Sequence, residues 1–207
     1  MRRPNTQLQS DRRSEILDSA QACFSRAGFH QTSMHAICSE AGMSPGNLYR
    51  YFPSKEAIIA GIAERDRADA AAAFSTAQSA PDFFTGLAGL ARHHLVERTK
   101  EEVGLCAEIM AESRRNADVA RIYQSIEADV KGRLVAMLRA ASERGEVSPD
   151  TDFNGVASVL MALADGISWR RAVDPDFDAE SVLPLIVHMV KCLLVAPAPA
   201  SSGEQIR

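Results

Sequence analysis

The stretch Ser33–Lys55, SMHAICSEAGMSPGNLYRYFPSK, predicts two short helices joined by a tight turn. Ser33 is a good N-cap residue, and the apolar residues that follow it recur at helical spacing. Gly42 can adopt the left-handed conformation that ends a helix. Ser44 then caps a second helix with Pro45 at its first position, where a missing N–H costs nothing. A helix, a short glycine-containing turn and a second helix form the helix-turn-helix pattern.

The second helix, about Pro45–Tyr51, presents hydrogen-bond donors and aromatic rings with little aliphatic bulk. Gly46 lets the backbone approach a partner closely, and the Asn47 amide suits an adenine edge. Arg50 suits guanine or a phosphate, and two tyrosines carry phenolic donors for phosphate oxygens. Lys55 adds a cation where a third helix begins, which favours an anion. The predicted DNA contacts in this segment are Ser44, Pro45, Gly46, Asn47, Tyr49, Arg50, Tyr51 and Lys55.

The segment from Arg13 to Ile59 resembles the N-terminal DNA-binding domain of the TetR family of bacterial transcriptional regulators. The matching residues keep a fixed spacing over the first third of the chain: Ile16, Leu17, Ala20, Phe24, Gly28, Phe29, Thr32, Ser33, Ile37, Ala41–Ser44, Gly46–Tyr49, Tyr51, Phe52 and Ser54–Glu56. The resemblance implies that Ser33 contacts a phosphate and His35 a base. It also implies an all-α fold and a dimer that binds DNA.

The charge distribution agrees with DNA binding at one end of the molecule. The 207-residue chain has a net charge of −4, but Met1–Lys55 holds seven Lys and Arg against four Asp and Glu, a balance of +3. The remaining residues carry a balance of −7. A basic head on an acidic body suits a protein of which only one end approaches phosphate, and it disfavours a protein that coats nucleic acid indiscriminately.

The sequence disfavours an enzyme, a metalloprotein and a membrane protein. It contains no nucleophile elbow, phosphate loop, metal cluster or carboxylate pair, so we expect no catalytic residues, metal or cofactor. The four cysteines, Cys23, Cys38, Cys106 and Cys192, are scattered, and most have apolar neighbours. They suit buried positions in a reducing cytosol, and a cysteine redox switch is the alternative. The apolar runs are too short to span a bilayer, and we expect a cytoplasmic protein.

Helical spacing of apolar residues extends through the chain and predicts an all-α fold with two domains. We expect a flexible basic arm at 1–10, a helix-turn-helix domain at 11–56, a helical ligand-binding and dimerisation domain at 57–196, and a disordered tail at 197–207. The expected helices are about 11–27, 33–52 as the paired motif, 55–78, 82–99, 102–114, 117–145, 152–172 and 178–195. The 55–78 helix runs from the DNA-binding domain into the second domain and links the two.

The last two helices predict the dimer interface. One apolar stripe holds Val156, Val159, Leu160, Leu163 and Ile167, and the other holds Leu183, Ile186, Val187, Val190 and Leu194. Two such helices per chain can pair with their copies as a four-helix interface, although both stripes also suit the core of one chain. The segment 160–178 further resembles the C-terminal region of choline-responsive repressors of the same family.

The expected second domain is rich in methionine and aromatic residues. Such residues suit either an adaptable ligand cavity or a plain core. The candidate ligand contacts are Phe84, His94, Cys106, Met110, Tyr123, Met137 and Trp169. Acidic residues beside Tyr123 or Trp169 would suit a cationic ligand. The sequence thus predicts a ligand-responsive repressor that binds a palindromic operator as a homodimer and is released by a small molecule.

Overall fold

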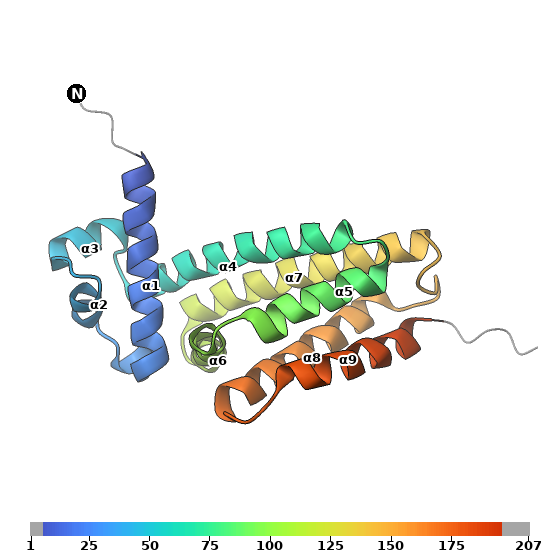
Figure 1. Ribbon diagram of the computed structural model, residues 1–207. Coiled ribbons are helices and arrows are strands. Elements are labelled where there is room, and N and C mark those ends of the chain that lie inside the picture. Colours follow the sequence, from blue (N-terminus) through green and yellow to red (C-terminus); the bar gives the residue numbers. More distant parts are fainter. Residues whose placement is uncertain (1–5, 196–207) are drawn as a thin grey trace, which may run out of the picture.

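The computed structural model describes residues 6–195, which form helices and turns without a strand. A small head at one end carries the first helices, and an elongated bundle forms the body (Figure 1). In chain order the elements are α1 (Thr6–Gln31), α2 (Met34–Glu40), α3 (Pro45–Tyr51), α4 (Lys55–Gln78), α5 (Phe83–Arg92), η1 (His93–Glu97), α6 (Lys100–Ser113), α7 (Ala117–Glu143), α8 (Phe153–Val173) and α9 (Ala179–Leu194). The all-α prediction is confirmed.

Side-chain caps explain most of the helix starts. Ser33 accepts a hydrogen bond from the Ala36 N–H at 3.0 Å, and Ser54 accepts one from Ala57. Thr99 and Glu102 form a reciprocal capping box at the start of α6. Ser44 is extended, as an N-cap residue should be, but its side chain makes no cap bond.

Gly42 bends the chain as predicted and Gly28 also bends it, but several expected boundaries differ. Gly28 (φ 75°) breaks helical geometry, although α1 continues for another turn to Gln31. Gly42 has φ 61° in the turn between α2 and α3. The first helix begins at Thr6, so the end of the expected flexible arm is helical. The expected 82–99 helix is α5 followed by a π-helical turn, η1. The 197–207 tail and residues 1–5 lie outside the described residues.

The core of the head extends into the body. Its buried side chains include Phe24 and Ile37 from the head, together with Leu105 of α6 and Val119 of α7. A second cluster fills the far part of the body between α4, α5, α7, α8 and α9. The head therefore shares its packing with the body, and the expected border between residues 56 and 57 falls inside α4 rather than in a linker.

The apolar stripes predicted to pair two chains lie mainly inside one chain. Val156 and Ile167 of α8, and Leu183 and Val190 of α9, are all buried within the bundle. Most of each predicted stripe therefore covers the rest of the body within one chain, whereas Val159 of the α8 stripe is exposed. The exposed side of the two helices is also apolar and carries Val159, Trp169, Val173, Leu185, Met189 and Leu193.

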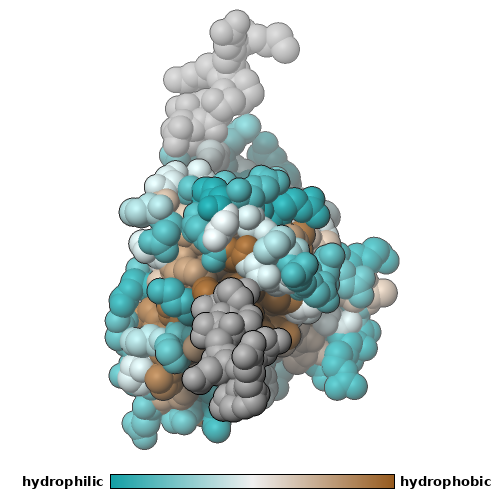
Figure 2. Space-filling model, turned by 90° about the vertical axis from the view of Figure 1, so that its right-hand side faces the viewer, coloured by the Kyte–Doolittle hydropathy of each residue, from teal (hydrophilic) through white to brown (hydrophobic). Residues whose placement is uncertain are grey.

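At the end of the body remote from the head, hydrophobic side chains reach the surface between hydrophilic ones (Figure 2). Leu193 and Val195, in and just after the last turn of α9, are each about half exposed, at 57% and 49%. Among the described residues, no helix is both long and apolar enough to cross a membrane.

Candidate functional site

The helix-turn-helix turns its apolar residues inward and its polar residues outward. Ile37 and Cys38 of α2 and Leu48 of α3 are buried in the head core. The turn is closed by a hydrogen bond from the Met43 N–H to the Cys38 carbonyl at 3.0 Å. The motif is therefore anchored by one face of each helix, which leaves the other face of α3 open to a partner.

Most of the predicted DNA contacts lie on this open surface. The exposed members of the set are Ser33, His35, Ser44, Pro45, Gly46, Tyr49 and Arg50. Tyr49 is 52% exposed, whereas Tyr51 is half-buried and packs against the head core. Asn47 is half-buried, and its side-chain amide makes no hydrogen bond within the described residues. The open face of α3 therefore offers a free amide, a phenol and a guanidinium.

Nothing in the head itself requires a glycine at position 46. A Cβ built there would meet no atom within 4 Å, and its φ is not positive. The small residue leaves the start of α3 bare toward solvent, where a partner can approach the backbone closely. Gly42 in the preceding turn differs, since its positive φ alone favours glycine.

Lys55 has a different environment from the one predicted. Its Nζ donates to the Phe29 carbonyl at 2.6 Å and lies 3.5 Å from the His30 carbonyl. The ammonium also lies 4.2 Å from the centre of the Phe29 ring. The cation thus fastens the start of α4 to the end of α1, and its role as a phosphate contact stays a prediction.

The body contains a polar cluster between five elements, which includes three of the predicted ligand contacts. Arg98 donates to Asp66 Oδ2 at 3.2 Å and lies 3.6 Å from Cys106 Sγ. The charge of Arg98 also acts on His94, and Tyr123 interacts with Glu127, Asp165 and Cys106. The residues of the cluster are Asp66 (α4), His94 (η1), Arg98, Cys106 (α6), Tyr123 and Glu127 (α7), and Asp165 (α8).

Burial shifts the titration of this cluster toward uncharged forms. Burial, together with the smaller effect of the nearby Arg98 cation, lowers the pKa of His94 to about 4. Burial also raises the pKa values of the Glu127 and Asp165 carboxyls and of the Tyr123 phenol. Asp165 makes no hydrogen bond within the described residues. The cluster is therefore a half-buried site rich in hydrogen-bond acceptors.

The other predicted ligand contacts are dispersed. Met137 is buried in the second core cluster, and Phe84 packs against that cluster beneath the Lys191 ammonium. Met110 is half-buried on α6. Trp169 is 55% exposed on α8, and its predicted contact with a ligand stays a prediction. Asp66, Arg98 and Glu127 of the cluster were not predicted from the sequence. The one signal for them is that each places a charged residue among the apolar residues of its segment.

The three cysteines other than Cys192 do not have the environment of reactive thiols. Burial raises the pKa values of the Cys23 and Cys106 thiols, which keeps them protonated and weakly nucleophilic. Cys38 is also buried, and only Cys192 is exposed. These environments give no support to the alternative of a cysteine redox switch.

Comparison with known proteins agrees with this architecture. Residues 16–62 match the model of bacterial regulatory proteins of the tetR family, and residues 90–195 match the C-terminal model of BetI-type transcriptional repressors. The chain is 35% identical to the HTH-type transcriptional regulator UidR of Escherichia coli K12 over 75% of this chain and 79% of that one. It is 27% identical to the repressor KstR of Rhodococcus jostii, over 90% of this chain and 85% of that one.

Solved structures show the same fold. Salmonella enterica GusR superposes with a TM-score of 0.79 and 32% identity, covering 89% of this chain and 95% of GusR. The fatty acid degradation regulator FadR of Bacillus halodurans has a TM-score of 0.80 at 17% identity, over 87% of this chain and 94% of that one. These relatives are transcriptional regulators and not enzymes. The chain belongs to the TetR family of bacterial transcriptional regulators.

Proposed function

We propose that this protein is a repressor that binds a palindromic operator as a homodimer and releases it when a small molecule enters the body. The observation that carries the proposal is the open face of α3, which combines an unpaired Asn47 amide with exposed Tyr49 and Arg50. These groups suit a base edge and the flanking phosphates. Gly46 supports the proposal because it leaves the start of α3 bare.

Within this proposal, Asn47 reads a base and the residues around it hold the backbone. Ser33, Ser44 and Tyr49 present hydroxyl groups to phosphates, while His35 and Arg50 reach a base or a phosphate. Pro45 starts the helix, and the partly packed Tyr51 contributes its phenol from the edge of the head core. We exclude Lys55 from the contact set because its ammonium is held by the end of α1.

A dimer is needed because α3 is a helix of seven residues with few base contacts. Two recognition helices would read half-sites about 34–36 Å apart, or a multiple of that distance. The exposed apolar face of α8 and α9 supports this assembly. Leu185 is 68% exposed and Trp169 55%, which is costly in water, and burial against a second copy would remove that cost.

The effector site in this proposal is the polar cluster of the body. Asp165 and Glu127 lack a cationic partner in the described residues, and Tyr123 interacts electrostatically with both. A ligand that enters here would contact α6, α7 and α8 together. The ligand can weaken DNA binding only if it binds the state that releases DNA more tightly than the state that binds DNA. The change in the free energy of DNA binding cannot exceed this difference in ligand binding free energy.

The test is selection of DNA from a random pool by the full-length protein, followed by titration of the selected fragment. A palindromic sequence, bound by two chains per duplex, is the expected result. Tyr49→Phe should weaken binding to all sequences alike, because a phosphate contact carries no sequence information. Selection of no sequence, or binding of one chain to one half-site with full affinity, would overturn the proposal.

A further inference from the structure

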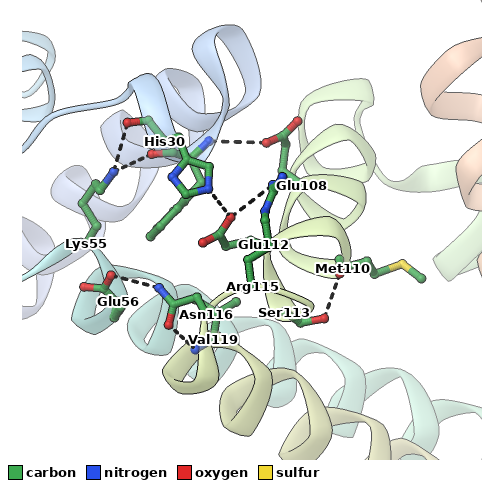
Figure 3. A network of polar contacts seen from close by, with 11 residues as sticks. His30, Lys55, Glu56, Glu108, Met110, Glu112, Ser113, Arg115, Asn116 and Val119 are labelled. Carbon is green, nitrogen blue, oxygen red and sulfur yellow. Dashed lines mark hydrogen bonds and ion pairs between the residues drawn. The ribbon is translucent and has the colours of Figure 1, made fainter.

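Two polar contacts join α6 to the end of α1, in addition to the contacts of Arg65 of α4 with Asp18 and Gln21 of α1. The Phe29 N–H donates to Glu108 Oε2 at 3.3 Å, and His30 Nε2 lies 2.7 Å from Glu112 Oε2 (Figure 3). The Glu112 side chain is only 3% exposed, and Arg115 reaches the same carboxylate oxygen at 3.3 Å. Two carboxylates one helical turn apart on α6 therefore contact two consecutive residues of the head, Phe29 and His30.

The backbone conformation at the end of α1 allows these contacts. Gly28 leaves helical geometry with φ 75°, and the next N–H is the one that donates to Glu108. A Cβ on Gly28 would lie 3.1 Å from Glu108 Oε2, tighter than ordinary packing, and the positive φ adds strain for any other residue. The Glu108 carboxylate thus packs directly against the kink at Gly28, which leaves little room for a side chain at that position.

The same junction is tied to α4 and α7. Lys55, at the start of α4, donates to the Phe29 carbonyl, so Phe29 is bound through its N–H by α6 and through its carbonyl by α4. Glu56 accepts a hydrogen bond from Asn116 at 3.3 Å, and Asn116 caps α7. A change in the position of α6 therefore reaches the head directly through α1, besides any path along α4.

Helix α6 also faces the polar cluster of the body. Cys106, two residues before Glu108, lies 3.6 Å from the Arg98 guanidinium inside that cluster. Leu105 and Glu108, on either side of Cys106, face the head instead. Because a helix of this length moves as a rigid unit, displacement at Cys106 also displaces the two carboxylates.

We propose that Glu108 and Glu112 are positioning residues that set the orientation of the DNA-binding head from α6. The two contacts fix the end of α1 on the body, and in a dimer they thereby fix the distance and angle between the two α3 helices. This inference rests on the proposed binding of a palindromic operator by a homodimer. It assigns the selectivity for half-site spacing to contacts that lie outside the DNA-binding surface.

The test measures how binding depends on half-site spacing. One base pair inserted or deleted between the half-sites moves one of them by about 3.4 Å and turns it by about a tenth of a helical turn. Rigidly held heads should then prefer the selected spacing by at least about 10-fold over either neighbour. Glu108→Ala and His30→Ala, alone and combined, break the two contacts at half-buried or exposed side chains. In the double variant we expect a preference below about 3-fold.

The matched control is Glu143→Ala, which removes an exposed carboxylate in the last turn of α7 and should keep the wild-type preference. Circular dichroism establishes that each variant is folded, and hydrogen exchange at the Phe29 amide reports loss of the Glu108 contact. Unchanged preference in a folded double variant would overturn the inference, as would an equal loss of affinity at all three spacings. Failure of the wild-type protein to bind as a dimer would instead overturn the proposed function.

Discussion

Lys55 allows a sharp test, because its sequence context indicates a phosphate contact and its surroundings indicate a structural role. Lys55→Met keeps the length of the side chain and removes the ammonium from the Phe29 carbonyl and ring. A hydrogen bond from a charged donor contributes about 1.5–3 kcal/mol, and a cation–π contact about 0.5–2 kcal/mol. Since one half-buried ammonium makes both contacts, we expect a combined loss of about 2 kcal/mol in the free energy of unfolding.

For a chain of this size a loss of about 2 kcal/mol should lower the melting temperature by about 4–8 °C. Thermal unfolding followed by circular dichroism measures this shift, and Lys131→Met, a half-buried lysine of α7, controls for the lost charge. The salt dependence of operator binding should stay within error of wild type, because no phosphate contact is removed. An unchanged melting temperature, with a salt slope lower by about one, would refute this reasoning and restore the phosphate contact.

Three further predictions concern base reading, assembly and pH. Asn47→Ala should weaken binding to the selected operator by about 1–3 kcal/mol and abolish preference at one base pair, as titration of base-substituted operators would show. Leu185→Glu places a charge on the most exposed apolar side chain of α9 and should convert dimer to monomer in sedimentation, whereas Gln124→Glu, an exposed position on α7, should leave it dimeric. The pKa of His94, lowered to about 4, lies below its unfolded value, so the unfolded chain binds more protons between about pH 4 and 6.5. Stability contributed by neutral His94 is therefore complete above about pH 6.5, is reduced by about 2 kcal/mol at pH 5, and is lost further toward pH 4. His94→Gln should flatten the pH dependence of the melting temperature over this window, and an unchanged slope would contradict the assignment.

The local features of the fold were predictable because they depend on neighbouring residues. The cap at Ser33, the turn at Gly42 and the proline at the start of α3 each act within one helical turn, and each was predicted from residue type alone. The start of α1 at Thr6 was missed, since the polar residues before Asp11 have no apolar spacing that would mark a helix.

The assignment of helix faces in the body could not be made from the sequence. Helices α8 and α9 carry apolar side chains on both the buried and the exposed face, with Val190 inside and Leu185 outside. Periodicity identifies an apolar stripe but does not decide which stripe covers the same chain and which covers a copy.

The contacts between head and body could not be predicted from the sequence for a different reason. Phe29 and Glu108 are 79 residues apart, and the donor is a backbone N–H that any residue other than proline would supply. The acceptor of Lys55 is likewise a backbone carbonyl. Patterns of side-chain type carry no information on such partners. Only the path of the chain, bent at Gly28, brings these groups together.

These contacts bear on how much free energy a ligand must supply. A 100-fold change in operator affinity needs about 2.7 kcal/mol of coupling between the two sites. One hydrogen bond to a charged group is worth about 1.5–3 kcal/mol, so loss of one or two contacts between α6 and α1 would supply it. The shared core, with Leu105 and Val119 packed among head residues, opposes rotation of the head as an independent body. A ligand beside Cys106 would therefore act most directly by shifting α6 against α1, and operator DNA must weaken its binding by the same factor.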